Sequence, residues 1–404
     1  MRNFVRNVGA VMLCVTGAFA HSSPTLPLYT PSELTQACNT VLQEAREGIK
    51  RLEDPGQTPQ LLDSWDDMAI MLEDVLGPVS LLSNAHPDVA VREAGEKCIS
   101  QASALDAEIY QNEILYQRVL SISAATSAAK RFQTQLIRGF QDSGVALPQD
   151  KRERIKVVLQ QLTDLSQTFS RNLRDNKARL TFSRAEQKGL SATYLAAQKK
   201  DTKGNISLGF SYPEYLPFMS SAEDENARRR YYKAFQSRGG EANLQLLDQI
   251  TALRKELADI NGYPSYAAFI TRKNMVGKPE VVLDFLAGVR SVVQEIELKD
   301  LAQLAQVKAI HTKTPLANTV MRAWDKDFYS EKLRQQQFQI DQEALRAYFP
   351  TEPTKQWALE LSSRLYGIKF TVKPVPTWHK SVEYYEVTDA KTGAFIGGLY
   401  LDLF

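Results

Sequence analysis

The side chains that most often do chemistry in proteins are sparse in this sequence. Histidine occurs four times, at His21, His86, His311 and His379, and no two of these lie close together along the chain. A short zinc motif such as H-E-x-x-H needs two histidines one helical turn apart, so the chain does not supply such a motif by itself. His379 alone is not a zinc site, and we interpret it as a packed or capping residue before the last hairpin.

Two further catalytic signatures are absent from the sequence. It contains no G-x-S-x-G turn of the kind that presents a nucleophilic serine, which disfavours a serine hydrolase. Gly277 and Lys278 match only the end of a phosphate-binding loop, because Pro279 stands where that loop needs a hydroxyl residue and the earlier glycine is missing. We interpret these three residues as a helix N-terminus.

Two charged stretches are interpreted as solvated helix surface. Residues 228–232 read RRRYY and could suggest a nucleic-acid contact, but helical spacing sends neighbouring residues to different faces. An acidic stretch further upstream lacks the glycine turn and the ligand spacing of a calcium loop. Its acids are Asp63, Asp66, Asp67, Glu73 and Asp74.

Composition indicates an ordinary globular protein without a strong charge bias. The chain has 404 residues, of which 43% are hydrophobic and 24% charged, enough for two or three domains and unlike a disordered chain. Lysine and arginine total 49 against 47 aspartates and glutamates, a formal charge of +2. Because nucleic-acid binding needs a marked basic excess, we expect no nucleic-acid partner.

The first twenty residues are typical of a secretory signal. They contain Arg2 and Arg6, no acid, an apolar stretch over residues 8–16, and the small-residue pattern A-F-A at 18–20. No later segment approaches the eighteen consecutive apolar residues of a membrane helix, so no membrane anchor is expected. We predict a signal peptide over residues 1–20 and export to the periplasm or the medium.

Three cysteines remain to be assigned. Cys14 lies within the predicted signal and follows the bulky Leu13, which disfavours a lipid attachment site. Cys38 and Cys98 could form one disulfide in an oxidising compartment, worth about 4 kcal/mol for so long a loop. The alternative is two buried free thiols in helices, which we favour slightly.

Helical periodicity dominates the rest of the chain. Thr30-Pro31-Ser32-Glu33 places a capping hydroxyl, a first-turn proline and a glutamate as at a helix start. Apolar residues recur at threes and fours over residues 152–175, 244–260 and 279–310, and each pattern predicts a helix with one buried stripe.

Strand signals are few and end at the C-terminal side. Residues 206–210 read as a short strand, after which we expect Pro213 and Pro217 to break the chain before a helix opens near Ser221. Residues 382–387 and 394–403 predict a hairpin around a turn-forming loop. An uncovered apolar edge strand at a chain end is an aggregation liability, so we expect a truncated chain; the alternative is a strand tucked into a complete sheet.

Several ordered blocks resemble the thimet oligopeptidase family of zinc metallopeptidases. The blocks occur in the same order as in the family and the last one matches closely, so chance does not explain them. The resemblance is strong from about Arg154 onward. The blocks are Tyr212–Met219 (YPEYLPFM), Arg254–Ala258 (RKELA) with Gly262–Tyr266 (GYPSY), Pro279–Leu286 (PEVVLDFL), Trp324-Asp325, Leu365–Ile368 (LYGI), Trp378-His379, and Tyr385-Glu386-Val387 leading through Gly393 to Tyr400–Leu403 (YLDL).

The resemblance implies a mainly helical, two-lobed oligopeptidase fold, here incomplete, with a small β-hairpin near the C-terminal end. It implies an N-terminal helical domain over residues 21–220 and the first part of a zinc peptidase domain over residues 221–404. In that family a H-E-x-x-H helix beyond the YLDL strand binds zinc, and a glutamate activates the bound water. No such helix occurs in these 404 residues, so we assign no catalytic, cofactor-binding or metal-binding residue and expect no specific zinc site.

The resemblance further implies hydrolysis of short unstructured peptides by a monomer, although this chain is expected to be inactive as it stands. One alternative is a noncatalytic peptide-binding or chaperone-like helical module that holds extended peptides by strand addition. Another is a nonfunctional truncated gene product that exposes core surface. Cleavage specificity, and the choice between endopeptidase and dipeptidyl carboxypeptidase, are left open by the sequence.

Overall fold

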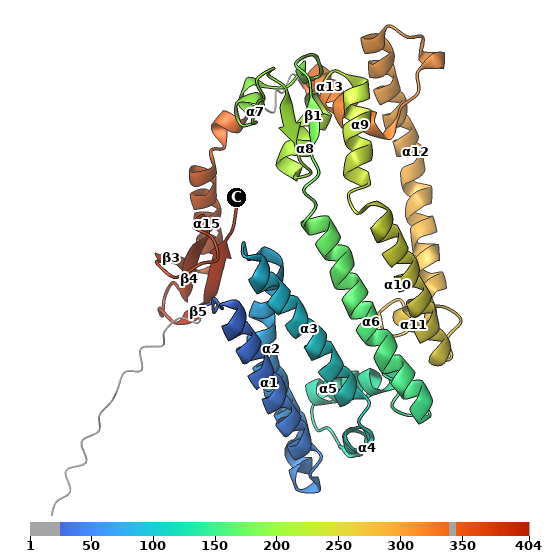
Figure 1. Ribbon diagram of the computed structural model, residues 1–404, viewed down its shortest axis with the longest axis vertical. Helices are drawn as coiled ribbons and strands as arrows, with labels where there is room; N and C mark the ends of the chain where they lie inside the picture. The colour runs from blue at the N-terminus through green and yellow to red at the C-terminus, as the bar shows by residue number, and fades with distance from the viewer. Residues whose placement is uncertain (1–24, 339–344, 404) are drawn as a thin grey trace, which may run out of the picture. The chain divides into compact units, whose positions relative to one another are not determined.

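The computed structural model describes residues 25–338 and 345–403, which fall into two compact units. Of the described residues, the larger unit comprises 29–338 and 345–350, and the smaller comprises 25–28 and 351–403. Helices make up most of the larger unit, and the smaller unit contains one helix and a small sheet (Figure 1), which confirms the mainly helical class with a small sheet near the C-terminal end. The predicted signal over residues 1–20 lies outside the described residues, and the two-lobed arrangement stays a prediction.

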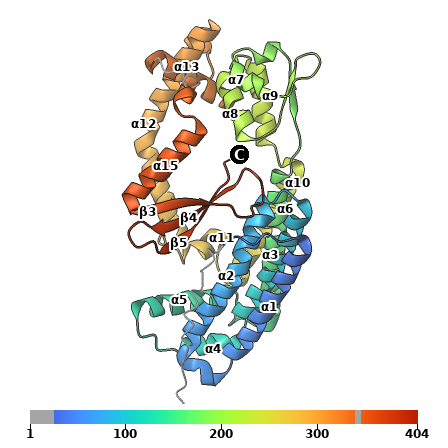
Figure 2. The ribbon, with the colours of Figure 1, turned by 90° about the vertical axis from the view of Figure 1, so that its left-hand side faces the viewer.

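Three long helices form the first part of the larger unit: α1 (Pro31–Leu52), α2 (Leu61–Ala85) and α3 (Val89–Tyr110). They pack on one another (Figures 1 and 2). The predicted start of α1 is confirmed, since the Thr30 side chain accepts from the Glu33 amide and the Glu33 carboxylate accepts from the Thr30 amide at 2.8 Å. Cys38 and Cys98 are joined by a disulfide that ties α1 to α3, so our preference for free thiols is wrong.

The middle of the larger unit is built on two helices that were predicted from periodicity. α6 (Gln149–Arg174) and α10 (Gly240–Ile260) pack lengthwise (Figure 1), and both helices are confirmed, although Leu244 and Leu247 of the predicted α10 stripe are exposed. Their shared core contains Ile155 and Val158 of α6 and Leu257 of α10. The neighbouring helices are α4 (Glu113–Ser121), α5 (Ser127–Asp142) and α11 (Tyr266–Thr271).

A small antiparallel pair of strands, β1 (Leu180–Phe182) and β2 (Ile206–Leu208), packs in a second core. The rings of Phe182, Phe218 and Tyr231 meet in this core at centroid distances of 4.4 to 5.3 Å. The elements that surround it are α7 (Ala192–Ala196), α8 (Tyr212–Ser221) and α9 (Glu225–Gln236). The strand predicted over residues 206–210 is confirmed in its first three residues.

The expectation that Pro213 and Pro217 break the chain is wrong, because both lie within α8. Pro213 occupies the first turn, where a helix has no partner for an amide hydrogen. Ser211 caps the helix by accepting from the Glu214 amide, and Pro217 removes one later bond. The next helix opens at Glu225, after an Asp224 cap, rather than near Ser221. The predicted domain boundary at residue 220 falls inside α8.

The long helix α12 (Pro279–Thr312) is confirmed as a helix, and its last turns pack against α13 (Lys326–Phe338). Its predicted stripe of buried apolar residues is exposed over the first five turns. Within the described residues, no helix is both long and apolar enough to span a membrane. The short 3-10 turns are Pro55–Gln60, Ala185–Gln187, Leu316–Asn318, Ala323–Asp325 and Arg346–Tyr348.

The smaller unit consists of α15 (Thr351–Tyr366) and a three-stranded antiparallel sheet (Figure 2). The strands are β3 (Ile368–Lys373), β4 (Glu383–Asp389) and β5 (Phe395–Leu401), in the order β3-β4-β5. The predicted hairpin is β4-β5 and is confirmed; β3 was not predicted. The Asp389 carboxylate accepts from the Thr392 amide at 2.7 Å, and Gly393 supplies the positive φ of 72° that the turn requires.

Candidate functional site

The three histidines in the described residues lie in different elements, and each uses its Nδ1 locally. In His86 this atom accepts from the Asp88 amide at 3.1 Å, and in His311 it lies 3.3 Å from the Tyr329 hydroxyl. In His379 it lies 2.7 Å from the Ser381 hydroxyl and accepts from the Ser381 amide at 3.3 Å. His379 therefore caps the turn before β4, which confirms its interpretation as a capping residue.

No group of three or more histidine, cysteine, aspartate or glutamate side chains is arranged to hold a metal ion among residues 25–338 and 345–403. The described residues therefore do not fit a zinc ion, which takes three or four protein ligands in enzymes. We assign no metal ligand and derive no catalytic step through a metal from these residues.

The motif residues of the sequence come together around the sheet of the smaller unit. The indole Nε1 of Trp378 donates to the Asp402 carboxylate at 2.9 Å, although 24 residues separate the two. The Tyr400 ring lies 5.3 Å from the Trp378 ring and 4.8 Å from the Tyr384 ring, between centroids. Tyr384 and Trp378 are buried. The W-H and YLDL motifs therefore share one packed aromatic cluster.

A charged cluster holds α15 against the same sheet. Lys355 of α15 is buried, and its ammonium donates to Glu383 of β4 at 2.7 Å and to Glu352 at 2.6 Å. The Tyr385 hydroxyl donates to the same Glu383 carboxylate at 2.7 Å. The Lys355 hydrogen bond lowers the pKa of Glu383, with a smaller contribution from Tyr385, whereas burial raises the pKa of Tyr385. Sequence reasoning missed this cluster.

The larger unit contains a second ion network, which is centred on a buried aspartate. Arg228 of α9 is 1% exposed and donates to the Asp325 carboxylate at 3.0 Å, and Asp325 is 0% exposed. Lys308 of α12 donates to the other Asp325 oxygen at 2.6 Å, and its ammonium lies 3.3 Å from Glu225. The interpretation of residues 228–232 as solvated surface is therefore wrong for Arg228; Tyr231 is buried as well.

The surroundings of this network are aromatic. The Arg228 guanidinium lies 4.0 Å from the centroid of the Phe328 ring, a cation–π contact. Burial raises the pKa of the neighbouring Tyr329 to about 12, and burial lowers the pKa of His311. Because its charges are compensated and only Glu225 faces solvent, the network is a structural joint between α9, α12 and the turn before α13.

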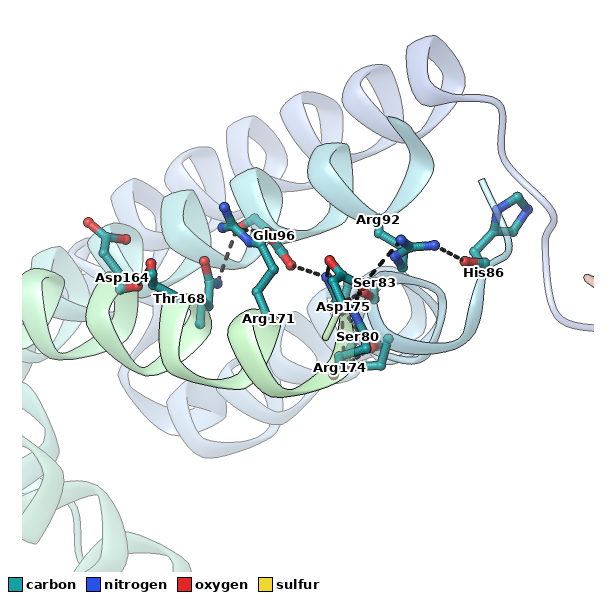
Figure 3. Close-up of polar contacts among 12 residues, drawn as sticks. Ser80, Ser83, His86, Arg92, Glu96, Asp164, Thr168, Arg171, Arg174 and Asp175 are labelled. Atoms are coloured by element: carbon teal, nitrogen blue, oxygen red, sulfur yellow. Dashed lines mark hydrogen bonds and ion pairs between the residues drawn. The ribbon is translucent and has the colours of Figure 1, made fainter. Parts of the chain in front are cut away.

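A third ion network joins α3 to α6 (Figure 3). Glu96 of α3 is 8% exposed, and its carboxylate pairs with Arg171 at 2.6 Å and Arg174 at 3.1 Å, both from α6. Arg92 donates to the His86 carbonyl oxygen at 2.8 Å and lies 3.5 Å from the Asp175 carboxylate (Figure 3). Opposite charges pair throughout, so this network also fastens helices together and presents no group poised as a nucleophile or general base.

Part of the chain is similar to a known peptidase family. Residues 218–404 match the model of Peptidase family M3. This match covers α9 to α13, α15 and the whole three-stranded sheet. This match, which covers a little under half of the chain, confirms the family resemblance found in its residues.

Its relatives are oligopeptidases. Oligopeptidase A of Escherichia coli (strain K12) is 29% identical over 418 residues, covering 94% of this chain and 60% of the relative. The probable cytosolic oligopeptidase A of Arabidopsis thaliana is 28% identical, covering 87% of this chain and 53% of the relative. Saccharolysin of Saccharomyces cerevisiae is 24% identical, covering 93% and 56%. The chain thus spans between 53% and 60% of the length of these three relatives.

Proposed function

We propose that these 404 residues form part of a zinc-dependent oligopeptidase that hydrolyses short unstructured peptides. The observation that carries this proposal is the Peptidase family M3 match, which runs through the β4-β5 hairpin and its YLDL strand. The names of the relatives supply the substrate class, because they are oligopeptidases.

We propose further that the 404-residue chain alone is inactive. A zinc ion, when bound, would lower the pKa of water and polarise the peptide carbonyl. The H-E-x-x-H motif that would bind it does not occur in the sequence, and no other ligand group among the described residues fits. The role of these residues is then to build and stiffen the scaffold of the peptidase domain, through the packed sheet and the buried ion networks described above.

The second candidate is peptide binding without hydrolysis. β5 lies at one edge of the sheet, so its outer backbone groups have no strand partner among the described residues. Phe395 and Ile396 at its start are 41% and 56% exposed. An extended peptide could pair with such an edge and place alternate side chains against the sheet.

One assay separates these proposals. The purified chain is incubated with internally quenched peptides of about ten residues, with and without added zinc, and peptide binding is followed separately by fluorescence polarisation. Escherichia coli oligopeptidase A serves as the positive control for the substrates. We expect no hydrolysis by the chain; zinc-dependent hydrolysis would contradict its inactivity and retain the family chemistry. Saturable binding without hydrolysis would favour the peptide-binding module.

Export and a monomeric state are proposals as well. The first twenty residues have the pattern of a signal, and the Cys38–Cys98 disulfide suits an oxidising compartment. One relative is named as a probable cytosolic protein, so the compartment is argued from this chain alone. The test is N-terminal sequencing of the protein recovered from periplasm or medium, where we expect a chain beginning near residue 21, and sedimentation analysis of its mass.

A further inference from the structure

The first five turns of α12 carry an apolar stripe that no element of the larger unit covers. Its residues are between 43% and 73% exposed and recur at spacings of three and four, so they share one face of the helix. The α12 stripe consists of Val281, Phe285, Leu286, Val289, Val292, Val293 and Ile296.

The remainder of α12 shows that the helix itself is firmly held. Leu304 and Val307 are buried against Phe328 and Tyr329 of α13. Lys308 is fixed in the buried ion network by Asp325. The exposed stripe is therefore one face of an anchored helix and not a frayed end, which makes it a preformed surface.

The size and pattern of the stripe indicate that another polypeptide surface covers it. Isolated exposed apolar residues are normal, but large contiguous apolar patches on a protein surface mark interaction sites. Seven large apolar side chains gather in this stripe, against three exposed leucines, Leu283, Leu298 and Leu301, on the other side of the helix, so the stripe is the larger apolar face of α12.

A membrane surface is a poorer occupant than a protein. Helices that lie on membranes carry an excess of lysine and arginine on their polar face. Between residues 281 and 300, α12 has only two basic residues, against four acids. The acids are Asp284, Glu295, Glu297 and Asp300, and the bases are Arg290 and Lys299. This charge balance disfavours docking on anionic lipid.

We propose that the α12 stripe is a docking surface for the polypeptide that corresponds to the unmatched part of the oligopeptidase relatives. This inference rests on the proposed function. α12 lies inside the Peptidase family M3 match, and the relative Escherichia coli oligopeptidase A is covered to only 60% of its length. The occupant is expected to present an amphipathic helix whose apolar face meets the stripe, in the same chain or in a second one.

The test uses cysteine labelling of α12 in two proteins. One is the 404-residue chain. The other is a chimera in which this chain is joined to the part of Escherichia coli oligopeptidase A that it does not match, with the segments in the same order as in that relative. Val292→Cys reports on the stripe, and Ser291→Cys, at an exposed polar position on the opposite side of the same helix, is the matched control. A Cys14→Ser background leaves Cys38 and Cys98 bonded to each other, so maleimide reacts only with the introduced thiol.

Docking predicts that Val292→Cys reacts about tenfold or more slowly in the chimera than in the 404-residue chain, equivalent to about 1.4 kcal/mol of protection. Ser291→Cys should react at similar rates in both proteins. Equal rates for Val292→Cys in both would overturn the proposal. Slow labelling of Val292→Cys already in the 404-residue chain would also overturn it, because another part of the chain or a second copy would then cover the stripe.

Peptide hydrolysis by the chimera is measured separately. Protection of Val292→Cys without hydrolysis would support docking and count against the proposed function. Hydrolysis without protection would support the proposed function and overturn docking. If the chimera fails to fold, co-expression of the two polypeptides as separate chains supplies the same labelling comparison, and absence of both co-purification and protection there would overturn docking.

Discussion

Asp325 is the residue whose replacement should most weaken the larger unit. Its carboxylate accepts from the Arg228 guanidinium at 3.0 Å, the Lys308 ammonium at 2.6 Å and the Arg322 amide at 3.0 Å, and it is fully buried. Asp325→Asn keeps the size of the side chain but leaves Arg228 buried without a counter-charge. Breaking a buried pair in this way costs 3–5 kcal/mol, and because Glu225 still faces Lys308 we expect about 3 kcal/mol.

The measurement is urea unfolding followed by circular dichroism, with the free energy of unfolding compared at equal m-value. Asp66→Asn, at an exposed position of α2, is the matched control and should change stability by no more than about 0.5 kcal/mol. Arg228→Met combined with Asp325→Asn should cost less than the sum of the two single changes, because the pair is removed together. A loss of under about 1 kcal/mol for Asp325→Asn would refute the reasoning that a desolvated charge pair holds this joint.

Two further predictions concern the disulfide and the sheet. Reduction of Cys38–Cys98, which closes a loop of 60 residues, should lower the free energy of unfolding by about 4 kcal/mol; unchanged urea midpoints for oxidised and reduced protein would contradict this. The folded pKa of Glu383 is depressed by Lys355, so the pair stabilises the fold above the ordinary glutamate pKa of about 4.3 and this stabilisation is lost as pH falls through the folded pKa. The melting temperatures of wild type and Lys355→Met should therefore converge as pH falls from 6 to 3; a constant difference would argue against the pair.

The helices that could be predicted from sequence are those whose signal is local. The capping box at Thr30 and Glu33 and the periodicity of α6 and α10 depend on neighbours within a few turns, and the structure contains this cap and both helices. The start of the predicted α10 stripe, Leu244 and Leu247, is exposed. The same local view failed at Pro217, because proline usually ends a helix and the sequence does not show that the surrounding aromatic core retains the last turn of α8.

Buried charges were harder to predict because their partners are distant in sequence. Arg228 shares a helix face with Tyr231 and Phe235 at spacings of three and four, which was a usable signal that it points inward. Its partner Asp325 lies 97 residues away, and only the fold brings the two together. The Cys38–Cys98 bond escaped prediction for the same reason, since sequence shows that a bond is permitted but not the distance between two helices.

The family motifs illustrate how a resemblance can identify a protein without identifying its chemistry. Trp378 and Asp402, which belong to two of the matching blocks, are joined by one hydrogen bond, and Tyr384 packs on Tyr400 of the YLDL strand. These residues pack the sheet, and none of them belongs to a group arranged to hold a metal ion among the described residues. Since they fix the register and packing of the hairpin, they are recognisable even where no catalytic group accompanies them. The motifs therefore support the family, whereas the activity has to be argued from residues able to bind a metal and activate water.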